Sequence, residues 1–68
     1  MSFVEINMRK DAEYLHKTCN FDTVHDLAWG VYELYVEACG SHIEDIPANR
    51  EESLVDLATQ ISSEIFSK

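Results

Sequence analysis

Apolar residues recur every three or four positions through three long stretches of this chain, and that spacing constrains the fold more than any other feature. Such a period places apolar side chains on one face of an α-helix. The 68 residues include one proline and two glycines, so few positions can interrupt a helix. The pattern predicts an all-α fold, a small three-helix bundle forming a single domain over residues 1–68, with helices at about 3–18, 23–39 and 50–66. The residues around 42–46 leave room for a short fourth helical turn.

Four expected helix starts carry an N-cap residue followed three positions later by an acidic residue. These pairs are Ser2 with Glu5, Thr23 with Asp26, Ser41 with Glu44, and Asn49 with Glu52. Gly40 follows the second helix, where a glycine commonly ends a helix, and Pro47 ends the connection before the third. Phe3 and Ile6 leave an extended start of the first segment as an alternative.

The predicted core takes one narrow apolar stripe from the first helix and one from the third. The first stripe consists of Val4, Met8, Ala12, Leu15 and Cys19. The stripe on the third helix consists of Leu54, Leu57, Ala58, Ile61 and Ile65.

The second helix is apolar over an arc of roughly 220°, which is more than two small neighbours easily cover. A chain of this size also gains only about 3–5 kcal/mol from its core, so a partner subunit is a plausible source of further stability. We therefore predict a homodimer whose interface lies beside the core stripe. Its residues are His25, Trp29, Tyr32, Val36, Val55 and Phe66. The alternative is that the third helix covers this side as well and that Trp29 is a core residue.

Thirteen acidic residues against five basic ones give the chain a formal charge of −8. This balance disfavours direct contact with nucleic acid or with anionic membranes and favours a partner protein with a basic surface. The acidic face predicted for that partner consists of Asp22, Asp26, Glu33 and Glu37. Two alternatives are a merely solvated face and an imitation of the nucleic-acid backbone.

Cys19 and Cys39 end the first and second helices, which places them about 24 Å apart if those helices are antiparallel, too far for a disulfide. We expect both to be buried and reduced. His16 and Cys19, with Cys39 and His42, match the local spacing of a zinc site, but the same distance argues against it. We predict no metal and no cofactor.

His25 stands beside Asp22 and Asp26, a setting in which a histidine can transfer protons, yet no nucleophile or glycine-rich phosphate loop accompanies it. We predict no enzymatic activity. Residues 1–10 lack the apolar run of a signal peptide, and no stretch is long enough to cross a membrane, so a cytoplasmic location is expected.

Together these features favour a small acidic cytoplasmic protein that binds another protein and inhibits or regulates it by occupying its surface. The principal alternative is a nucleic-acid mimic that inhibits a DNA- or RNA-binding protein or a defence complex, similar in size and acidity to inhibitors that phages encode. A zinc-binding or catalytic domain is the more distant alternative.

Overall fold

The computed structural model describes residues 3–40 and 43–67, and every regular element in this part of the chain is helical. Helix α1 spans Phe3–Thr18, α2 spans Val24–Ala38 and α3 spans Ala48–Phe66. A short 3-10 helix, η1 (Ile43–Asp45), lies in the connection between α2 and α3. The predicted all-α bundle of three main helices is confirmed.

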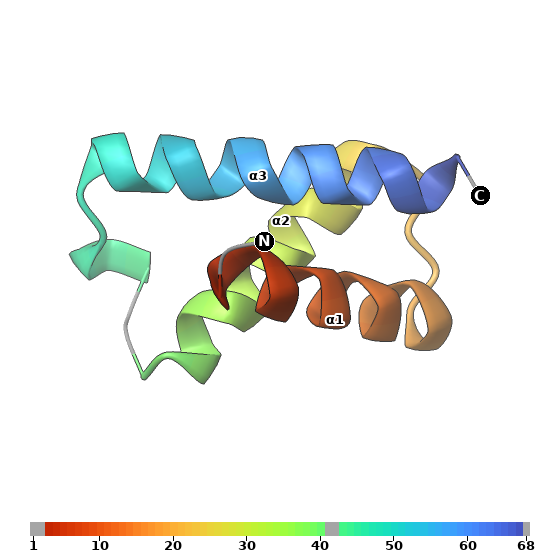
Figure 1. The fold of residues 1–68 in the computed structure, drawn as a ribbon, viewed down its shortest axis with the longest axis horizontal. Coiled ribbons are helices and arrows are strands. Elements are labelled where there is room, and N and C mark those ends of the chain that lie inside the picture. The colour runs from red at the N-terminus through yellow and green to blue at the C-terminus, as the bar shows by residue number, and fades with distance from the viewer. Residues whose placement is uncertain (1–2, 41–42, 68) are drawn as a thin grey trace.

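Helix α2 packs against both other helices. In Figure 1, α1 and α3 run in nearly parallel lines across the view, and α2 crosses behind them, with the C-terminal ends of α1 and α2 on opposite sides of the molecule. The contacts of α2 with α3 and with α1 are more extensive than those between α1 and α3. The shared core of the bundle therefore lies along α2.

The core takes residues from all three helices, and among the described residues six of the twelve buried hydrophobic ones lie on α2. Met8 and Ala12 come from α1, as its apolar stripe predicts, and Val4 and Leu15 are half-buried beside them. Four residues of the stripe predicted on the third helix, Leu54, Ala58, Ile61 and Ile65, are buried, and Leu57 is half-buried against them.

The predicted boundaries of α2 are confirmed at both ends. The side chain of Thr23 accepts a hydrogen bond from the backbone N–H of Asp26 at 3.1 Å, which satisfies one of the unpaired donors of the first turn. Gly40 has a φ of 76°, in the left-handed region that glycine enters without steric cost. Its N–H donates to the carbonyl of Glu37 at 3.0 Å and completes the last turn.

The predicted start of the third helix at Asn49 is wrong. The carbonyl of Pro47 accepts the first helical hydrogen bond, from the N–H of Glu51 at 2.9 Å, so the helix begins at Ala48 and Asn49 lies inside it. Pro47 has no side-chain hydroxyl or carboxylate with which to cap the helix, and α3 starts without a side-chain cap. The other two predicted caps depend on Ser2 and Ser41, which lie outside the described residues.

Within the described residues, none of the helices combines the length and the apolar character that spanning a membrane requires.

Substitutions of Thr23 and Asn49 give a direct test of where α2 and α3 begin. Replacing Thr23 with Ala should lower the free energy of unfolding by about 1 kcal/mol, because the first turn of α2 loses its side-chain cap. Urea unfolding followed by circular dichroism measures this. Asn49→Ala is the matched control and should change stability by less than about 0.5 kcal/mol. A larger loss for Asn49→Ala than for Thr23→Ala would contradict the assigned starts of both helices.

Candidate functional site

The interface predicted on the second helix is in part the core of the bundle. Tyr32 is fully buried and Val36 is 2% exposed, and both belong to the main hydrophobic cluster. A second copy could not reach either side chain without unfolding the bundle. Their placement in an interface is therefore corrected: α3 and α1 together enclose the wide apolar arc of α2.

The other members of that predicted interface are only partly accessible. His25 is exposed, whereas Trp29, Val55 and Phe66 are half-buried and pack against the core. The Trp29 ring meets the ring of Tyr32 edge to face, with centroids 5.7 Å apart, and it meets the ring of His25 at 6.2 Å. Trp29 therefore packs against the edge of the core and keeps part of its ring accessible.

The four acidic residues predicted to face a partner are all exposed, and we call them the acidic strip: Asp22, Asp26, Glu33 and Glu37. Three of them lie on α2, and Asp22 lies just before it. None has an ion-pair partner within residues 3–40 and 43–67. The structure thus presents a row of carboxylates whose charge no neighbouring side chain neutralises.

The ion pairs of the described residues converge instead on Arg9 of α1. One terminal nitrogen of its guanidinium donates to Glu64 of α3 at 2.8 Å, and the other lies 3.4 Å from Glu5. The hydrogen bond to Glu64 contributes most to raising the pKa of Arg9 above its ordinary value. This arrangement ties α1 to α3, and its cation is not available to the acidic strip.

The outer side of α1 carries exposed apolar residues that sequence reasoning missed. Among the described residues, the large hydrophobic side chains that are exposed all lie on this helix: Phe3 at 79%, Ile6 at 40% and Tyr14 at 61%. They fall off the stripe of Val4, Met8 and Ala12, and Lys10, which lies between Ile6 and Tyr14, hides the pattern. The signal that could have revealed them is the helical spacing of three and eight residues from Phe3 to Ile6 and from Ile6 to Tyr14.

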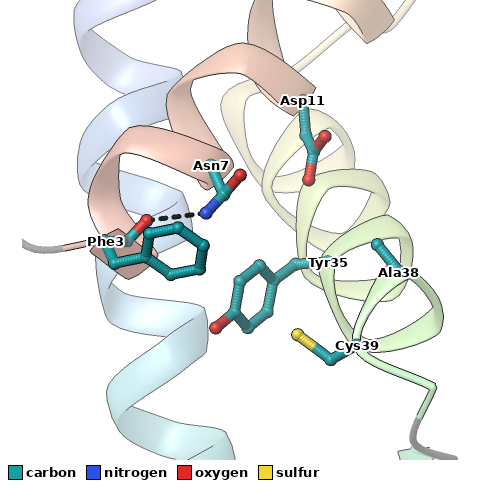
Figure 2. A pocket seen from close by; sticks show the side chains of 6 residues that line it. All are labelled: Phe3, Asn7, Asp11, Tyr35, Ala38 and Cys39. Atoms are coloured by element: carbon teal, nitrogen blue, oxygen red, sulfur yellow. Dashed lines mark hydrogen bonds between the residues drawn. The ribbon is translucent and has the colours of Figure 1, made fainter.

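A pocket of about 180 Å³ opens beside Phe3, between α1 and the end of α2. Figure 2 shows the rings of Phe3 and Tyr35 pointing into this space, with Asn7 donating a hydrogen bond to the carbonyl of Phe3 at 2.9 Å. Burial raises the pKa of Asp11, and burial together with the adjacent thiol of Cys39 raises the pKa of Tyr35. Of the three α1 residues that line the pocket, Phe3 is apolar, whereas Asn7 and Asp11 are polar.

The expected burial of the two cysteines is wrong, because both are exposed free thiols. Cys19 lies just beyond the last residue of α1, and Cys39 caps the end of α2, so neither belongs to the regular part of a helix that packs in the bundle. Of the four residues with zinc-site spacing, His42 lies outside the described residues. Within the described part of the chain, no three His, Cys, Asp or Glu side chains are grouped so as to hold a metal ion.

Comparisons of the chain with protein-family models, with curated proteins and with solved structures found no match in any of the three. The basis for a functional proposal is therefore the chemistry of the exposed surfaces.

The hydroxyl of Tyr32 is buried with the rest of its side chain, and its hydrogen bonding can be tested. It has no hydrogen-bond partner among the described residues, and such a group costs about 1–3 kcal/mol when it is buried. Tyr32→Phe should therefore leave the free energy of unfolding unchanged or raise it, as measured by urea unfolding. Tyr14→Phe, which removes an exposed hydroxyl, is the control and should change nothing. A loss of more than about 1 kcal/mol for Tyr32→Phe would show that the hydroxyl is satisfied.

The exposure of both cysteines predicts their reactivity. A thiol-specific chromogenic reagent should modify both Cys19 and Cys39 in the folded protein, because neither thiol has to be uncovered by unfolding. The Cys19→Ser and Cys39→Ser variants assign the two reactions. If either thiol reacted only in denaturant, the original expectation of buried cysteines would be right for that residue.

Proposed function

We propose that this chain is a small acidic cytoplasmic protein that binds a basic surface on another protein and, by occupying it, inhibits or regulates that protein. The observation that carries the proposal is the acidic strip, whose four carboxylates are exposed and have no ion-pair partner among the described residues. A row of unneutralised carboxylates on a rigid helix attracts a basic surface and fixes the orientation in which it docks.

The distribution of charge along the fold supports this. Helix α2 carries three acidic residues and neither lysine nor arginine, and α3 carries four acidic residues against Arg50 alone. Helix α1, with three acidic and three basic residues, is neutral. The negative field of the chain therefore arises on α2, on α3 and in their connections, where it increases the rate of encounter with a basic partner.

Two further parts of the proposal concern the setting in which the protein acts. The exposed free thiols of Cys19 and Cys39 are typical of a reducing compartment, which supports a cytoplasmic location. We also propose that the protein acts as a homodimer, so that each assembly presents two acidic strips.

Salt dependence and charge neutralisation test the proposed binding. The wild-type chain held on beads should retain a basic protein from a lysate of the native host at low salt and release it as the salt concentration rises. Glu33→Gln/Glu37→Gln should lower this retention about tenfold, because two charge pairs of up to ~1 kcal/mol each are lost. Quantitative mass spectrometry of the retained protein gives the measurement.

The matched control is Glu52→Gln/Asp56→Asn, which removes the same charge from exposed positions on α3. Retention should be unchanged by it. Equal losses in both variants would show that total charge, rather than the acidic strip, governs binding. Release of the retained protein by short DNA or RNA fragments would favour the mimic instead.

A further inference from the structure

One wall of the pocket beside Phe3 is a row of three α1 residues that combines a ring, an amide and a carboxylate. Phe3, Asn7 and Asp11 follow one another at spacings of four residues, so they share one side of α1 over about 12 Å of its axis. Figure 2 shows the carboxylate of Asp11 pointing toward α2 from one end of this row, with the ring of Phe3 at the other end. The pocket therefore has a charged end and an aromatic end.

The wall that α2 contributes is rigid at its base and open at its rim. Tyr35 is 8% exposed, so the core holds its ring in place, whereas Ala38 and Cys39 lie at the exposed end of the helix. The amide nitrogen of Asn7 donates to the carbonyl of Phe3, which leaves its oxygen as a further acceptor. None of the six lining residues carries a positive charge.

No cation in the described part of the chain neutralises Asp11, which has neither an ion pair nor a hydrogen bond there. Burial raises the pKa of Asp11, because partial removal from water disfavours a carboxylate that no cation stabilises. Burial is also the main cause that raises the pKa of Tyr35, and the charge of Arg50 opposes that rise. Arg50 is nevertheless exposed on α3 and does not line the pocket.

We propose that this pocket binds a primary alkylammonium ion, with the charged group against Asp11 and the hydrocarbon chain beside the rings of Phe3 and Tyr35. An ammonium group donates three hydrogen bonds, and the carboxylate of Asp11 and the amide oxygen of Asn7 accept them. The faces of aromatic rings attract a positive charge and cover the adjoining methylene groups. The ligand thus supplies the cation that Asp11 lacks.

Other classes of small ligand fit this pocket less well. An anion is repelled by Asp11 and by the formal charge of −8 on the chain. A neutral apolar molecule would displace water from the carboxylate without offering it a cation. A divalent metal ion requires several oxygen ligands, and the described residues contain no group of three His, Cys, Asp or Glu side chains that could hold one.

The volume of the pocket limits the size of the ligand. The space is about 180 Å³, and a cavity of about 150 Å³ in another protein binds benzene. A molecule of about six non-hydrogen atoms, such as n-pentylamine, therefore matches the pocket. The same alkylammonium chemistry occurs in free amines and at the end of a lysine side chain.

The pocket is separate from the acidic strip, so this site goes beyond the proposed function and does not depend on it. Glu33 and Glu37 lie two residues before and after Tyr35, which places each about 160° away from it around α2. An amine bound in the pocket therefore leaves the carboxylates of the strip accessible to a partner.

Titration of the wild-type protein with n-pentylammonium, followed by proton–nitrogen correlation NMR at constant ionic strength, tests the site. The backbone amide signals of Asn7, Asp11 and Cys39 should shift and saturate, with a dissociation constant on the order of 1 mM for so small a ligand. n-Pentanol, which has the same size and no charge, should bind about fivefold more weakly, because one charge pair is lost. Pentanoate should not bind.

Variants of the lining residues locate the binding. Asp11→Asn should weaken n-pentylammonium binding about fivefold and leave n-pentanol binding unchanged. Glu13→Gln removes the same charge from an exposed position on another side of α1 and should leave both affinities unchanged. Ala38→Leu should abolish binding, because the larger side chain fills the pocket, and should preserve the helical circular dichroism spectrum, because leucine favours helices.

The outcomes decide the proposal without depending on any one variant. The absence of saturable shifts, equal affinity for n-pentanol, or an equal loss of affinity in Glu13→Gln would overturn it. If Asp11→Asn failed to fold, the comparison of n-pentylammonium with n-pentanol in the wild type would still decide. Tighter binding of N-acetyl-lysine N-methylamide than of n-pentylammonium would assign the pocket to a lysine side chain, and weaker binding to a free amine; both support an alkylammonium site.

Discussion

The enclosure of α2 by α1 and α3 is the interaction on which the rest of this structure depends. Half of the buried hydrophobic residues lie on α2, and the extensive contacts of the bundle are those it makes with its two neighbours. Each buried large apolar side chain contributes about 1.5–3 kcal/mol. Without α2, helices α1 and α3 would lose the common surface against which both pack. A chain of 68 residues is too short to form a second hydrophobic core that could replace it.

This enclosure also determines where the charges of the chain can lie. The apolar arc of α2 faces both neighbouring helices, so its acidic residues occupy the narrow side that remains, and they form a row for that reason. Helix α1 buries only Met8 and Ala12 fully, which leaves most of its circumference in contact with solvent. Its free side therefore combines exposed apolar residues with charges of both signs, whereas α2 keeps the two kinds of side chain apart.

Periodicity predicted the helices and most of the core, because the angular position of a side chain on a helix follows directly from residue number. It did not give the number of neighbours around each helix. The wide apolar arc of α2 was interpreted as surplus surface for a partner, whereas packing against two other helices buries most of such an arc and leaves exposed only its end at Ala38 and Cys39. Tyr32 and Val36 were misplaced for this reason.

The remaining errors lie at helix ends, where the periodic pattern no longer applies. Cys19 fits the apolar stripe of α1 but lies beyond its last turn, and Asn49 resembles a cap although the carbonyl of Pro47 already begins the helix. Phe3 and Ile6 were considered only as a possible extended start, and Tyr14 was not considered at all, because an apolar residue off the main stripe of a helix looks isolated in the sequence until the fold shows which residues share its side.

The same packing keeps the proposed partner contact apart from the core. The acidic strip lies on the side of α2 that its apolar arc leaves free, so a partner bound there covers none of the side chains on which the bundle depends. Carboxylates gathered on one side of a helix repel one another, and a basic surface docked on them relieves that repulsion. A partner that binds the folded chain and not the unfolded one stabilises the fold by mass action, so the proposed contact and the stability of the bundle are linked through charge rather than through shared residues.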